Sequence, residues 1–113
     1  MSKPRPSPGS SALACDLGAL SAMEQEERAA LSTRFLEAVR QVGEIANGFE
    51  FELDRKSVSI RELAAWVELE QKCCPFLDFV LKDFRDPNSL TLVLLGRRGV
   101  KVFIRAEFSP AFP

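Results

Sequence analysis

The chain has 113 residues, a length that fits a single domain with an apolar core of its own. Its 15 Lys and Arg residues nearly balance its 16 Asp and Glu residues, so no basic field attracts nucleic acid or an anionic membrane. Histidine and tyrosine are both absent, which excludes Ser-His and Cys-His catalytic arrangements and histidine-based metal sites.

The N-terminal residues are rich in Pro, Ser and Gly, and they predict a disordered arm over 1–11, followed by a single α/β domain over 12–113. Neither the arm nor any later segment has the apolar run of a signal peptide or a membrane span. Three cysteines are an odd number, which favours reduced thiols over a disulfide framework. We therefore expect a cytoplasmic protein without a membrane partner.

The first helix is predicted from a capping signal. Residues 12–17 are apolar and predict either a short edge strand at 12–15 or an extended lead-in to that helix. Ser21 and Glu24 have the spacing of a capping box, so a helix should begin there. Apolar residues then recur at three-and-four spacing as far as Val42, which predicts a helix ending near Gly43 or near Asn47-Gly48.

Later segments alternate between strand and helix signals. Residues 49–53 have the period of two that is typical of a half-buried strand. Ser59 and Glu62 form a second capping box, and the helix that they begin should end at Cys74, before Pro75. Two β-rich runs at 77–82 and 90–95, with turn-forming residues between them, predict an antiparallel hairpin. The segment 99–108 fits a strand or a helix.

Together these elements predict an α/β (α+β) fold. We expect a two-layer sandwich, in which the helices that begin near Ser21 and Ser59 pack on one face of a small, mainly antiparallel sheet.

The cysteine pair is the most concentrated chemistry in the sequence. A helical wheel places Cys74 on the apolar arc of the second helix, with Cys73 about 100° away. Glu70 lies near the same arc, either as a structural hydrogen-bond partner or as a functional carboxylate. A Cys73–Cys74 disulfide is disfavoured because adjacent Cα atoms are only about 3.8 Å apart. The negative end of the helix dipole disfavours a dithiol oxidoreductase.

Capture of a soft ion suits these residues better. Thiolates select soft metals, and three of them form a trigonal shell if Cys15 folds back beside Cys73 and Cys74. Glu70 would accept a proton released on binding, or would supply the fourth ligand that zinc requires. The predicted ligands are therefore Cys73, Cys74, Cys15 and Glu70, and the expected cofactor is a soft metal or metalloid ion.

Two other functions stay open. One is a non-catalytic interaction or regulatory module, in which the cysteines pack the core and the Pro-rich arm contacts a protein partner. An exposed Phe84 or Phe112 would then indicate a homodimer contact. The other is an enzyme with Cys73 as nucleophile, which the missing histidine and the helix end disfavour. We predict no catalytic residue and rank metal binding first.

The run from Glu70 to Leu77, Glu-Gln-Lys-Cys-Cys-Pro-Phe-Leu, resembles a family of small bacterial proteins with a Glu-x-x-Cys-Cys-Pro-Phe signature. The resemblance covers most of the chain, from Cys15, which matches an early cysteine of the family, to a Gly-x-x-Gly-Val-Lys-x-Phe segment at 96–103. Related domains occur with regulators of the mercury-responsive type. The resemblance implies a scaffold, a thiol site and a helix at 99–108, although Val102 makes that segment more strand-like than the family pattern.

Overall fold

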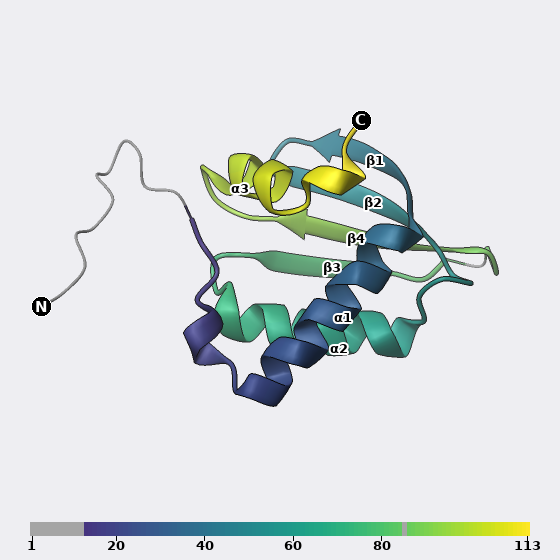
Figure 1. The fold of residues 1–113 in the computed structure, drawn as a ribbon. Helices are drawn as coiled ribbons and strands as arrows, with labels where there is room; N and C mark the ends of the chain where they lie inside the picture. The colour runs from purple at the N-terminus through teal and green to yellow at the C-terminus, as the bar shows by residue number, and fades with distance from the viewer. Residues whose placement is uncertain (1–12, 85) are drawn as a thin grey trace, which may run out of the picture.

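The computed structural model describes residues 13–84 and 86–113 (Figure 1). Its elements, in chain order, are η2 (Leu17–Ala19), α1 (Ala22–Ala38), β1 (Val39–Ile45), β2 (Gly48–Asp54), α2 (Ile60–Cys73), β3 (Asp78–Lys82), β4 (Ser89–Leu95), α3 (Val100–Glu107) and η3 (Ser109–Ala111). The predicted arm at 1–11 and the first residue of the predicted edge strand lie outside the described residues. Residues 13–16 are irregular rather than a strand.

The four strands form one antiparallel sheet in the order β1-β2-β4-β3. In the central strands β2 and β4, alternate side chains are buried, as a period of two requires. The buried set on these two strands is Phe49, Phe51, Leu53, Leu90, Leu92 and Leu94. The register places Phe51 opposite Leu92 and Leu53 opposite Leu90, so these side chains form one continuous apolar face.

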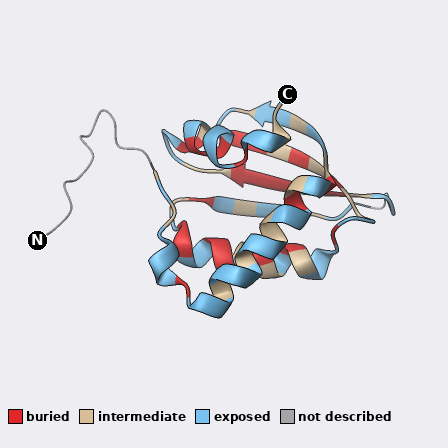
Figure 2. Ribbon diagram, in the orientation of Figure 1, coloured by how far each residue is buried: buried red, intermediate tan, exposed pale blue. Residues whose placement is uncertain are grey.

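The helices cover this apolar face and leave the other face of the sheet open (Figures 1 and 2). Phe35 of α1 packs edge-on against Phe51 of the sheet and stacks on Trp66 of α2, with ring centroids 5.3 Å and 4.8 Å away. On α3, the guanidinium of Arg105 lies over the ring of Phe49, 4.9 Å from its centroid. The predicted α+β sandwich, with helices on one face of an antiparallel sheet, is therefore confirmed.

Both predicted capping boxes are present. Ser21 accepts a hydrogen bond from the backbone N–H of Glu24, whose carboxylate accepts one from the backbone N–H of Ser21. Ser59 and Glu62 exchange the same two bonds at the start of α2. These bonds satisfy N–H groups that have no partner within the helix, so the predicted helix starts are confirmed.

The predicted end of the first helix was wrong. α1 ends at Ala38, and residues 39–45 form β1, which turns at residues 46–47 into β2. Val39 and Val42 both pack against the core, and their three-residue spacing resembles that of a helix face. In the strand, a register shift between Val39 and Gln41 inserts an extra residue, so both valines point toward the helices.

The segment that periodicity left open is helical. α3 begins after Gly99, which adopts a left-handed conformation with φ of 95°, favourable for glycine because it has no Cβ. Val100, Phe103 and Ile104 are buried, whereas Val102 is exposed, so the strand-like alternation at Val102 is a surface feature. None of the helices in residues 13–84 and 86–113 is long and apolar enough to cross a membrane.

Candidate thiol site

The cysteine pair closes α2, and the chain before α1 folds back onto it. Cys73 is the last residue of the helix and Cys74 is its C-cap, and both are fully buried. The backbone N–H of Asp16 donates a 2.7 Å hydrogen bond to the carbonyl of Cys73. The Asp16 carboxylate also caps η2 by accepting from the N–H of Gly18. These contacts place Cys15 beside the end of α2.

Cys15 and Cys74 form a disulfide, with their Cα atoms 4.6 Å apart and a sequence separation of 59. The expectation of three reduced thiols is therefore wrong for this state of the protein. Odd cysteine number and composition carry no information about which distant segments meet, and here the lead-in to η2 crosses the end of α2. The adjacent cysteines are not bridged to each other, and Cys73 is a free thiol.

All three sulfur atoms lie within 4.8 Å of one another. The Sγ of Cys73 is 3.6 Å from the Sγ of Cys74. Cys73 Sγ is also 3.9 Å from Oε2 of Glu70, and Cys74 Sγ is 3.7 Å from Oε1 of the same carboxylate. The structure therefore brings together the four residues singled out from the sequence in one cluster, in which Cys73, Cys74 and Glu70 are buried and Cys15 is half-buried.

The carboxylate of Glu70 is fully buried, and Arg28 of α1 is its partner. Nε of Arg28 donates to Oε2 of Glu70, and one terminal nitrogen of the same guanidinium lies 3.8 Å from the Sγ of Cys15. That nitrogen is also 3.4 Å from Oε2 of Glu107 on α3. Arg28 therefore connects the carboxylate, the disulfide and the third helix.

Arg28 is the functional residue that sequence reasoning missed. Its position seven residues before Phe35 puts the two side chains on the same face of α1, about two helical turns apart. A charged side chain on an apolar helix face requires a partner of opposite charge. Glu70 is also a charged side chain on an apolar face, that of α2. Arg28 and Glu70 are both charged residues on otherwise apolar helix faces, and their opposite charges were the signal that could have predicted the ion pair.

The electrostatics of the cluster raise the pKa values of its two acidic groups, Glu70 and Cys73. Burial raises the pKa of Glu70, and the charge of Arg28 opposes that rise without cancelling it. Burial also raises the pKa of the Cys73 thiol, and the negative charge of Glu70 raises it further. For Arg28, burial opposes the charged form, but the charge and hydrogen bond of Glu70 outweigh it and raise the pKa. Cys73 is therefore a protonated thiol at neutral pH, not an activated nucleophile.

A cavity of about 350 Å³ lies next to the cluster, between the segment before α1, α1 itself and α3. Its lining is mainly apolar and includes one member of the cysteine trio, Cys15. The lining residues are Leu13, Ala14, Cys15, Leu17, Arg28, Val102, Phe103, Ala106 and Glu107. Because Cys73 and Cys74 are fully buried, a molecule in this cavity meets the cluster at Cys15.

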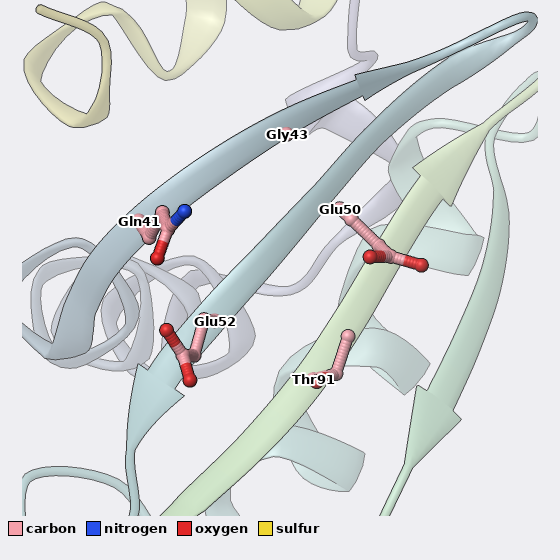
Figure 3. A pocket seen from close by; sticks show the side chains of 5 residues that line it. All are labelled: Gln41, Gly43, Glu50, Glu52 and Thr91. Atoms are coloured by element: carbon pink, nitrogen blue, oxygen red, sulfur yellow. The ribbon is translucent and has the colours of Figure 1, made fainter.

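A second hollow lies on the uncovered face of the sheet and has a different character. Figure 3 shows that Gln41, Gly43, Glu50, Glu52 and Thr91 line it, from β1, β2 and β4. Its lining is polar and contains no thiol. The sulfur chemistry of the described residues therefore lies on the helical side of the sheet.

The two phenylalanines that could indicate a dimer contact differ in exposure. Phe84, after β3, is 65% exposed. Phe112 packs edge-on against Phe49, with ring centroids 5.0 Å apart, and belongs to the periphery of the core. The homodimer stays a prediction that rests on Phe84 alone.

Comparison of the chain with family models, with curated proteins and with solved structures found no match. What the thiol cluster does therefore has to follow from its own chemistry.

Proposed function

We propose that this protein binds a soft metal or metalloid ion through the thiolates of Cys15, Cys73 and Cys74. The observation that carries the proposal is the approach of three sulfur atoms to within 4.8 Å of one another. Two thiolates that share an ion at about 2.3 Å are roughly 3.8 Å apart when the geometry is tetrahedral. The 3.6 Å between the sulfur atoms of Cys73 and Cys74 is close to that spacing.

Binding by all three cysteines requires reduction of the Cys15–Cys74 disulfide. In a cytosolic setting, which the proposal includes, thiols are kept reduced. We expect Cys15 to stay near the pair after reduction, because the hydrogen bond from the Asp16 N–H to the Cys73 carbonyl does not depend on the disulfide. The disulfide state is closed to the ion, and the dithiol state offers three soft ligands.

Glu70 serves this site as a proton acceptor. Its two oxygens lie 3.9 Å from Cys73 Sγ and 3.7 Å from Cys74 Sγ, close enough to take up protons that the ion displaces. As a fourth ligand, Glu70 would offer Oε1, because its other oxygen, Oε2, accepts the bond from Arg28. The guanidinium also offsets part of the negative charge of three thiolates.

A structural role for the cysteines in an interaction or regulatory module is the second candidate. It is favoured by the full burial of Cys73 and Cys74 and by the disulfide, which ties the segment before α1 to α2. An enzyme with Cys73 as nucleophile ranks below both, because the raised pKa of that thiol disfavours the thiolate.

Native mass spectrometry distinguishes the two leading candidates. We would compare the oxidised and the reduced protein with arsenite, mercuric and zinc ions, and repeat the titrations with Cys15→Ser, Cys73→Ser and Cys74→Ser. The matched control is Met23→Ser, which removes an exposed sulfur that is not a thiol. A folded reduced protein that binds one ion with loss of thiol protons, weakened in each cysteine variant and unchanged in Met23→Ser, supports ion binding. If the folded reduced protein forms no adduct, ion binding is ruled out and the structural module is the remaining candidate.

A further inference from the structure

We propose that the thiol cluster takes an organic form of the metalloid, a monosubstituted trivalent arsenical, and that its organic group occupies the cavity beside Cys15. The inference rests on the proposed function and names its substrate class. The juxtaposition that carries it is an apolar cavity with one of three clustered sulfur ligands in its wall.

The cavity has the size and lining for a small organic group. Its volume of about 350 Å³ falls at the lower end of the range of ligand pockets and exceeds the roughly 150 Å³ cavity that holds a benzene ring. The apolar side chains Leu13, Leu17, Val102, Phe103 and Ala106 supply most of the wall. A bare inorganic ion would leave this cavity unfilled, whereas a phenyl group would fill part of it and bury apolar surface.

The polar rim of the cavity defines the charge of the substituent. Arg28 and Glu107 face each other there at 3.4 Å. Arg28 also bonds the buried carboxylate of Glu70, so two carboxylates share its single positive charge. The rim therefore favours a neutral group over an anion, and the guanidinium next to the cavity favours an aromatic ring over an alkyl chain.

The binding step involves Cys15 and Cys74, because their sulfur atoms are close enough to form a disulfide and Cys15 faces the cavity. In the reduced protein, the hydrated arsenical R–As(OH)2 forms two As–S bonds and loses two As–O bonds. Each thiol proton leaves with a hydroxide as water, and no electron is transferred. The third bond of arsenic carries the organic group into the cavity, and Cys73 remains a free thiol.

The experiment compares phenylarsine oxide with arsenite on the reduced protein after removal of the added reductant, with affinities from native mass spectrometry and competition titration. Ala106→Trp, at an exposed position of α3, fills the cavity without removing a sulfur. Val102→Trp, at a 74% exposed position, is a second filling variant. Ala30→Trp, at an exposed position of α1 away from the cavity, is the matched control.

We expect each filling variant to weaken phenylarsine oxide binding at least about tenfold, the scale of burying a ring, and to leave arsenite binding unchanged. Ala30→Trp should change neither. The Cys73→Ser variant should still form the phenylarsine adduct but should bind arsenite more weakly. Equal affinity of phenylarsine oxide for the folded filling variants and the wild type, or loss of its adduct in Cys73→Ser, would overturn the inference while three-thiol binding of arsenite stands. Failure of both compounds to bind the folded reduced protein would overturn the proposed function as well.

Discussion

Arg28 on α1 donates its Nε–H to the carboxylate of Glu70 on α2, and this bond joins two helices whose contacting residues are 42 positions apart in the chain. Glu70 is fully buried and the Arg28 side chain is only 12% exposed, so neither charge has water as an adequate alternative partner. The pair lies against the sulfur cluster and connects it with the packing of the helices.

Arg28→Met removes the partner of a buried carboxylate, and at neutral pH we expect the free energy of unfolding to fall by about 3–5 kcal/mol. Urea unfolding followed by Trp66 fluorescence measures the loss. The matched control is Arg34→Met, which breaks an exposed pair with Glu62 and should cost about 0–1 kcal/mol. The double variant with Glu70→Gln should recover much of the stability. Similar small losses in both single variants would contradict a buried pair that depends on Arg28.

The pH dependence of stability reports on Glu70. Its pKa in the folded protein is raised above the ordinary value of 4.5 by burial, so the fold binds this proton more tightly than the unfolded chain does. The contribution of Glu70 to stability is therefore fully present below about pH 4.5 and is lost as the pH rises through the raised pKa. Glu70→Gln removes this dependence.

The measurement is the difference in free energy of unfolding between wild type and Glu70→Gln across acidic and neutral pH. We expect the wild type to lose stability relative to the variant as the pH rises above 4.5. Glu26→Gln, at an exposed position of α1, controls for the change from carboxylate to amide. A difference between wild type and Glu70→Gln that does not vary with pH would show that the carboxyl does not titrate as described.

The disulfide can be detected by counting free thiols, and its contribution to the free energy of unfolding can be measured. Unfolded without reductant, the protein should take up one alkylating group, at Cys73, and after reduction it should take up three. Because the bond closes a loop with a sequence separation of 59, reduction should lower the free energy of unfolding by about 2–4 kcal/mol. Mass spectrometry gives the count and urea titration gives the energy. Three labels in the absence of reductant would mean that the isolated protein is in the dithiol state.

Cys73 should resist alkylation in the native oxidised protein at neutral pH, because it is fully buried and its thiol pKa is raised. Labelling should begin only at alkaline pH or in denaturant. Since the charge of Glu70 contributes to the raised pKa, Glu70→Gln should move the onset of labelling to lower pH. Rapid labelling of native Cys73 at neutral pH would indicate an activated nucleophile and would favour the enzyme, now the third candidate.

Local patterns were sufficient to predict most of the fold. The alternation around Phe51 identified β2, and the two Ser-x-x-Glu boxes identified the starts of α1 and α2, since each depends on neighbours within a few residues. The end of α1 was mistaken because a bulged strand and a helix both place Val39 and Val42 on one side. Where the local pattern fits both a helix and a strand, the sheet that forms around the residues determines their secondary structure.

The candidate site was predictable only in part. Cys73, Cys74 and Glu70 share one helix end, so their proximity follows from helix geometry. The approach of Cys15 depends on how the segment before α1 crosses α2, and the role of Arg28 depends on the packing of two helices. Both are relations between distant segments, which periodicity does not encode.

The junction between α1 and β1 has a consequence for the tolerance of this chain to changes in length. Val39 is both the C-cap of α1 and the first residue of β1, so no connecting residue separates helix from strand. One inserted residue would rotate α1 by about 100° about its axis or invert which side chains of β1 face the helices. The rotation would turn Arg28 away from Glu70, and the inversion would turn Val39 and Val42 away from the core. The junction is therefore among the segments least able to accept an insertion or a deletion.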